Sequence, residues 1–264
     1  MQLCLDDVSL NLNTLRNCWQ EETEVTLSAA TRERVERSAT RVDALIASGR
    51  QVYGLNTGFG QLATVRIGDA ELRTLQENLL ASHSSGVGPP LSTDVVRLIL
   101  LMKIVALAKG YSGATPTLLD ALCALLGKRI YPLIPAKGSV GASGDLAPLA
   151  HLAGTLLGIG DVLVEGRQTT ASDALAAAGI ARHELQPKEG LALINGTQVS
   201  TALALAALFK AEHVFAAALV AGALSADAIK GSDTPFDARI QTVRGHAGQI
   251  DVAAALRALM DGSA

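Results

Sequence analysis

The most apolar part of the chain, residues 200–228, constrains the fold more than any other segment. Three charged residues and a histidine interrupt it, namely Lys210, Glu212, His213 and Asp227. A membrane-spanning helix needs about 20 nearly uncharged residues, so the segment predicts a helix buried in a bundle, and we expect no membrane partner. Hydrophobic residues make up 49% of the chain but aromatic residues only 3%. A core dominated by Ala and Leu favours packed helices over a β-sandwich, so we expect a mainly α fold.

Charge and cysteine content exclude several classes of protein. The formal net charge is −3 and no basic run is present, which argues against a nucleic-acid partner. Cys4, Cys18 and Cys123 are widely spaced and odd in number, so we expect neither a disulfide framework nor a zinc site, and no metal at all. Asp6 and Asp7 stand where a signal peptide needs apolar residues. We therefore expect a cytoplasmic protein.

Helical periodicity and punctuation by Gly and Pro predict the secondary structure. We expect Asp69 to be an N-cap, Ser92 or Thr93 to cap the next helix, and the long apolar helix to break near Gly222. A small hairpin is expected over residues 162–168. Helices are expected over residues 29–50, 69–82, 92–109, 116–127, 145–157, 172–178, 196–231 and 251–260.

The loop that precedes the helix at residue 145 carries the most chemical information. It is not a phosphate-binding loop, because no Gly-Lys-Ser/Thr follows, and it is not a nucleophile elbow, because Asp145 stands where the last Gly is needed. The order Ala142-Ser143-Gly144 suits another reaction. In a sharp bend the Gly144 nitrogen can attack the Ala142 carbonyl with loss of water, and loss of the Ser143 hydroxyl then leaves an electrophilic methylidene group. The start of the following helix favours developing negative charge, and Asp145 can cap that helix or assist the dehydration.

Four blocks resemble, in the same order, the family of histidine, phenylalanine and tyrosine ammonia-lyases and aminomutases. They are YGLNTGFG at 53–60, GSVGASGDLAPLAH at 138–151, KEGLALINGT at 188–197 and PFDAR at 235–239. The resemblance implies that Ala142, Ser143 and Gly144, assisted by Asp145, form 4-methylidene-imidazole-5-one (MIO), with no metal or nucleotide. It also implies an N-terminal MIO-forming, active-site domain over residues 1–195. Residues 196–264 would begin a central bundle of long helices that is truncated here.

The same resemblance assigns roles to three further residues, each of which also has a simpler structural explanation. Tyr53 becomes a catalytic tyrosine that assists proton removal at the substrate β-carbon, although it can also anchor a loop by packing. His83 becomes a contact for the substrate ring, although it can also cap a helix. Asn195 becomes a partner of the MIO ring or of the substrate amino group, although Asn-Gly alone suggests only a turn. His151 is expected to be structural and hydrogen-bonded, and no role is expected for His183, His213 or His246.

The pair Ser82-His83 is similar to that of the histidine enzymes of this family, so the resemblance implies L-histidine as the substrate, with urocanate and ammonia as products. Members of the family are about twice as long as this chain and form homotetramers. We therefore expect little activity from this chain alone and exposed apolar surface over residues 200–224. Three alternatives stay open: a tyrosine or phenylalanine ammonia-lyase or aminomutase, a non-catalytic interaction module that keeps the signature, and a serine hydrolase that uses Ser143.

Overall fold

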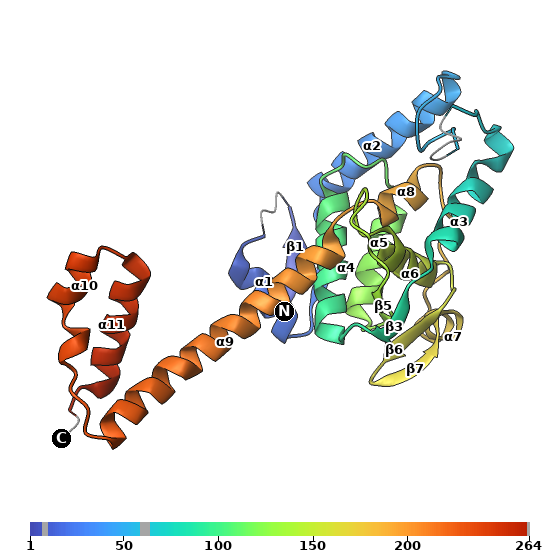
Figure 1. The fold of residues 1–264 in the computed structure, drawn as a ribbon. Helices are drawn as coiled ribbons and strands as arrows, with labels where there is room; N and C mark the ends of the chain where they lie inside the picture. Colours follow the sequence, from blue (N-terminus) through green and yellow to red (C-terminus); the bar gives the residue numbers. More distant parts are fainter. Residues whose placement is uncertain (7–9, 59–63, 263–264) are drawn as a thin grey trace. The chain divides into compact units, whose positions relative to one another are not determined.

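The computed structural model describes residues 1–6, 10–58 and 64–262 (Figure 1). Phe59 and Gly60, the end of the expected loop over residues 53–60, lie outside these described residues. The chain divides into two compact units, Met1–Ala204 and Leu205–Ala264. Every residue predicted for the active site falls in the first unit.

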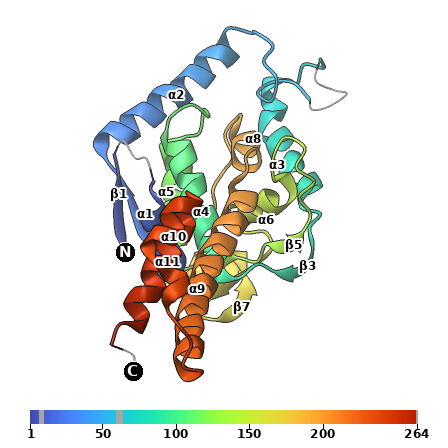
Figure 2. The same cartoon turned by 60° about the vertical axis from the view of Figure 1, so that its left-hand side comes forward.

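Helices are the main secondary structure of the first unit, and α4 (Thr93–Ala108) forms its centre. This helix is apolar on nearly all sides, so α1, α2 and α5 can pack around it. α3, α6 and α8 pack against one another, and Figure 2 shows these three helices side by side. The other helices of this unit are α1 (Leu12–Gln20), α2 (Ala29–Ala47), a 3-10 turn (Asp69–Glu71), α3 (Leu72–His83), α5 (Pro116–Gly127), α6 (Leu146–Leu156), α7 (Ala171–Ala177) and α8 (Glu189–Ile194).

Short strands form three small sheets in this unit. β1 (Gln2–Leu5) pairs in parallel with β2 (Glu24–Leu27), and β3 (Val87–Pro90) pairs in antiparallel fashion with β5 (Pro135–Lys137). β6 (Asp161–Val164) lies between β4 (Tyr131–Pro132) and β7 (Arg167–Thr170). The predicted hairpin is confirmed as β6–β7, and its two-residue turn places Glu165 and Gly166 at φ 49° and 77°, the positive angles that such a turn requires.

The long helix α9 (Gln198–Ala228) runs from the end of the first unit into the second and has no break at Gly222. The second unit continues with a 3-10 turn (Thr234–Phe236), α10 (Ala238–Arg244) and α11 (Ala247–Met260). Many apolar side chains of α9 are exposed, among them Val214, Phe215 and Leu224. The prediction of exposed apolar surface on this helix is thus confirmed. The prediction that the helix is buried in a bundle is wrong for this chain by itself. Within the described residues, one helical stretch, Glu189–Ala228, has the length and hydropathy of a membrane-crossing helix.

Most predicted helices are confirmed, with shifted ends. Thr115 caps α5 through the amide of Leu118, and Pro116 occupies the first turn as expected. Ser92 is the N-cap residue of α4, but its side chain makes no capping bond. The expected start of α3 at Asp69 is early, because Asp69–Glu71 forms a 3-10 turn. The short helices α1, α8 and α10 were not predicted, since so few turns give no clear periodicity.

Candidate active site

The triplet Ala142-Ser143-Gly144 lies in an exposed bend immediately before α6. Its backbone is neither extended nor helical. Gly141, Ser143 and Gly144 have φ values of 71°, 61° and 111°. Glycine reaches such angles without strain, but a serine there is held at a cost in free energy. The chain therefore holds the triplet in a sharp bend.

Gly144 lies directly against the backbone of Gly196, in the segment between α8 and α9. A Cβ atom at residue 144 would stand 2.4 Å from the Gly196 carbonyl oxygen and 2.8 Å from its nitrogen. The amide of Asp145 donates to the same carbonyl oxygen over 2.7 Å. Only glycine fits at residue 144, because any side chain would push these two segments apart.

Asn195 closes α8 and reaches the triplet. Its side-chain Nδ2 donates to the main-chain oxygen of Ser143 over 2.5 Å, and its own amide donates to the Leu191 carbonyl. The structure thus brings Asn195 and the triplet together. The catalytic role of each stays a prediction.

Asp145 is buried and holds the loop of the triplet to the start of α9. Its Oδ1 accepts from the Ser139 hydroxyl over 2.8 Å. Its Oδ2 accepts from the amide and the hydroxyl of Ser200 over 2.8 and 2.9 Å. Asp145 occupies the N-cap position of α6 as expected, but its carboxylate makes no capping bond to this helix. Its part in dehydration stays a prediction.

His83 is the last residue of α3, and both hydrogen bonds of its ring involve the Nδ1 atom. Nδ1 lies 2.8 Å from the Leu79 carbonyl oxygen and 3.1 Å from the Ser82 hydroxyl. A carbonyl oxygen can only accept, so the bond to Leu79 requires a proton on Nδ1. In the neutral ring the lone pair is then on Nε2, which can accept a hydrogen bond.

His151 connects α6 to the segment that follows His83. Its Nε2 accepts from the amide of Gly86 over 3.1 Å, so its expected hydrogen-bonded, structural role is confirmed. Burial lowers the pKa of His151, which favours the neutral ring that this bond needs. Gly86 also lies so close to Gly138 that a Cβ on Gly138 would stand 3.0 Å from the Gly86 Cα. These contacts join the segment after His83 to the start of the triplet loop and to α6, the helix that follows it.

Tyr53 lies in the turn that follows α2, and its side chain is 56% exposed. The turn is held by the buried side chain of Asn56, whose Oδ1 accepts from the Val52 amide and whose Nδ2 donates to the Arg50 carbonyl, each over 2.8 Å. The role of Tyr53 at the substrate β-carbon stays a prediction.

Glu189, which opens α8, is a buried carboxylate that the sequence analysis did not single out. Its Oε1 accepts from the amide and hydroxyl of Thr115, and its Oε2 from the Gln186 amide and from His183 over 2.7 Å. Burial raises its pKa, but the hydrogen bonds, that from His183 foremost, lower the pKa on balance. His183, for which no role was expected, thus helps to fix the helix that carries Asn195.

Lys103 is a second buried charge that the sequence analysis missed, although a lysine inside an otherwise apolar helix is itself a signal. It is 1% exposed, and burial lowers its pKa to about 7 despite the opposing effect of Asp145.

Within the described residues there is no cluster of three or more His, Cys, Asp or Glu that could hold a metal ion.

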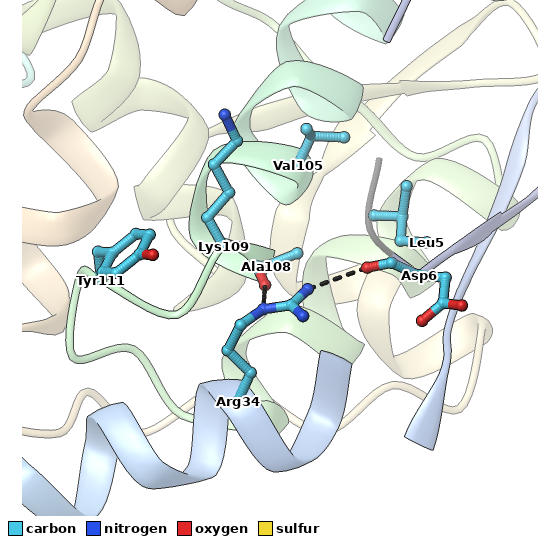
Figure 3. Close-up of a pocket in the computed structure, with 7 residues that line it drawn as sticks. All are labelled: Leu5, Asp6, Arg34, Val105, Ala108, Lys109 and Tyr111. Atoms are coloured by element: carbon cyan, nitrogen blue, oxygen red, sulfur yellow. Dashed lines mark hydrogen bonds between the residues drawn. The ribbon is translucent and has the colours of Figure 1, made fainter. Parts of the chain in front are cut away.

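A separate surface pocket of about 290 Å³ is lined by residues of β1, α2 and α4 and by Tyr111 (Figure 3). The guanidinium of Arg34, one of the lining residues, donates to the main-chain oxygens of Ala108 and Asp6 over 3.3 and 2.9 Å. This arginine therefore joins α2 to α4 and to the residue that follows β1. The pocket shares no lining residue with the predicted site.

Comparison with known proteins decides the family. The model of the aromatic amino acid lyase family matches residues 10–264. The chain belongs to the aromatic amino acid lyase family.

Curated histidine ammonia-lyases are similar members of the aromatic amino acid lyase family. That of Aromatoleum aromaticum is 54% identical over 261 residues, which cover 99% of this chain and 50% of the relative. That of Burkholderia pseudomallei is 52% identical over 255 residues, covering 97% and 50%. The chain thus spans about half the length of the curated relatives it matches.

Solved structures of the aromatic amino acid lyase family share the fold. Tyrosine aminomutase of Streptomyces globisporus has a TM-score of 0.91 at 37% identity, covering 99% of this chain and 49% of that one. Histidine ammonia-lyase of Trypanosoma cruzi has a TM-score of 0.89 at 33% identity, covering 98% and 50%. The predicted mainly α fold, with short helices, a hairpin and a long helix, is confirmed.

Proposed function

We propose that this chain supplies the electrophile-forming half of an ammonia-lyase that eliminates ammonia from L-histidine to give urocanate. The bent triplet held by Asn195 carries the proposal, because a tripeptide bent in this way is prepared for ring closure. The similarity to curated histidine ammonia-lyases supports the choice of substrate.

The residues present fit MIO as the cofactor. Ala142, Ser143 and Gly144 would form it, since the bend is sharp and Gly144 lacks a Cβ where one would collide. Joining the Gly144 nitrogen to the Ala142 carbonyl carbon expels one water, and loss of the Ser143 hydroxyl with its α-proton expels a second. The finished group supplies an electrophilic carbon that makes ammonia a better leaving group.

In this proposal, three side chains position the reaction partners. Asn195 holds the Ser143 oxygen through its amide. The Nε2 lone pair of His83 is suited to accept a hydrogen bond from an imidazole N–H of the substrate. Tyr53 would receive the β-proton, and this role requires electrostatic help because a free tyrosine has a pKa of about 10.

The assembly and location of the complete protein form part of the same proposal. The exposed apolar side chains of α9 support association into a homo-oligomer, a tetramer in the full-length form. The absence of a basic run in the sequence supports a small-molecule substrate rather than nucleic acid. We infer a cytoplasmic enzyme without a membrane partner.

Intact-mass measurement of this chain and of the peptide that contains the triplet tests the proposal. We expect a deficit of two waters, about 36 Da, in the triplet. We expect urocanate, detected by its absorbance, to form only when a C-terminal half from a related lyase is co-expressed. The Ser143→Ala variant is the control: without the hydroxyl it cannot lose the second water, so its deficit should not exceed one water. An unmodified triplet under both conditions would favour the interaction-module alternative, and robust turnover by the chain alone would contradict the proposed division of the site.

A second candidate function is that of a tyrosine ammonia-lyase or aminomutase, because the similarity to the Streptomyces globisporus aminomutase is also high. Turnover of histidine and of tyrosine by the same co-expressed complex separates the two. Faster turnover of tyrosine would favour this candidate.

A further inference from the structure

Lys103 lies in the middle of α4, where its side chain is 1% exposed. Its Nζ donates to the main-chain oxygen of Ala192 over 3.3 Å. Burying an ammonium group is costly, and an apolar residue of similar length would fill the same volume without that cost. A buried lysine with a defined acceptor therefore points to a role beyond packing.

Ala192 is in the last turn of α8 (Glu189–Ile194). The carbonyl groups in the last turn of a helix have no partner within the helix and form its negative end. A lysine that donates there stabilises the end of the helix. Lys103 therefore fixes the turn from which Asn195 leaves.

Asn195 follows three residues after Ala192. Its amide donates to the Leu191 carbonyl over 2.9 Å, and its side-chain Nδ2 donates to the Ser143 oxygen over 2.5 Å. The buried ammonium and the bent triplet are thus linked through residues 192–195. A shift at the Ala192 carbonyl would pass directly to the Asn195 side chain, because so few residues separate them.

We propose that Lys103 is a positioning residue that holds the end of α8 so that the Asn195 amide stays on the Ser143 carbonyl, and that maturation of the triplet depends on this contact. The second half of the proposal rests on the proposed function. The positive charge of Lys103 is also close enough to Asp145, the residue after the triplet, for that carboxylate to raise the pKa of Lys103. Lys103 is therefore linked to Ser143 through Asn195 and interacts electrostatically with the residue that follows the triplet.

Maturation is tested by intact mass in Lys103→Met, with Lys109→Met as the matched control. Lys109 is exposed at the end of the same helix, so the control makes the same chemical change without touching α8. We expect the dehydrated form to appear about tenfold or more slowly in Lys103→Met, at the unchanged rate in Lys109→Met, and with partial rescue in Lys103→Arg. The double variant with Asn195→Ala should be no slower than Asn195→Ala alone, because both changes break the same contact.

The contact itself is tested without any chemistry by the NMR signals of the Asn195 side-chain amide. They should show a hydrogen bond in the unsubstituted chain and in Lys103→Gln, which keeps a donor, and should lose it in Lys103→Met. Unchanged amide signals in folded Lys103→Met overturn the positioning role. Changed signals with an unmodified triplet in every variant, including the unsubstituted chain, refute the proposed cofactor and the maturation role but leave the positioning role standing.

Discussion

The side-chain amide of Asn195 donates a hydrogen bond to the main-chain carbonyl of Ser143, 52 residues earlier in the chain. The bond joins the end of α8 to the centre of the triplet. It also places an N–H donor on the one carbonyl that conjugates with the methylidene group of the proposed cofactor. The bond therefore gives the Asn195 side chain a specific long-range contact, which a local Asn-Gly turn would not require.

Replacement of Asn195 by alanine should lower turnover of the co-expressed complex by about 10²–10³-fold, the usual effect of removing a donor aimed at developing charge. The rate of urocanate formation measures this loss. Asn13→Ala, on the exposed face of α1, is the control and should keep full turnover. Equal rates in both variants would contradict a role for the Asn195 amide.

Gly144→Ala and Gly141→Ala form a matched pair that separates backbone strain from collision. Both glycines have positive φ, 111° and 71°, but a Cβ at residue 141 meets nothing within 4 Å, whereas one at residue 144 meets the Gly196 backbone. We expect Gly141→Ala to lower the free energy of unfolding by about 1 kcal/mol and to leave dehydration intact. Gly144→Ala should lose more stability and remain at full mass. Denaturant unfolding and intact mass measure both effects, and similar losses in the two variants would argue against the collision.

Glu189→Gln should destabilise the chain by about 1–3 kcal/mol near pH 7, because an amide replaces an oxygen that accepts from buried donors. The pKa of Glu189 is lowered from 4.5 in the folded chain. Its contribution is therefore fully present above that value and is lost as the pH falls through the lower, folded value. Urea unfolding from pH 7 to pH 3 should show the difference between the two proteins shrinking. The exposed Glu36→Gln is the control, and a difference that does not change with pH would contradict this assignment.

Lys103→Met should raise the free energy of unfolding at neutral pH, because it removes a buried charge. The pKa of Lys103 falls from 10.5 to about 7 on folding. Between these values the unfolded chain keeps a proton that the folded chain has lost, so the stability of the unsubstituted chain should rise with pH across this window. The advantage of the variant, a few kcal/mol at most below pH 7, should shrink toward pH 10. Parallel stability curves for the two proteins would refute this titration.

His151→Leu should loosen the segment that follows His83, since the Gly86 amide then loses its acceptor at a cost of about 1–3 kcal/mol. We expect KM for histidine to rise more than kcat falls in the co-expressed complex, because the bond positions a binding residue rather than a reacting atom. The exposed His246→Leu is the control. A loss confined to kcat would place the effect of His151 at the triplet instead.

The residues themselves determined much of the local structure. The Thr115-Pro116 pair starts α5, Glu165-Gly166 forms the turn of the hairpin, and the small residues around Ser143 allow the bend before α6. Each of these features depends on side-chain caps, steric limits on φ or hydrogen bonds between near neighbours, so a local pattern was enough to predict it.

Only the tertiary structure decided how the distant segments support the triplet. Asp145 looked like a helix cap, but Ser200 reaches its carboxylate across 55 residues and takes the place of the capping amides. The acceptor of Lys103 lies 89 residues away, in a helix too short to be recognised from its sequence. Such contacts depend on which helix faces pack together, and that outcome is set by burial over the whole unit rather than by any neighbouring pattern.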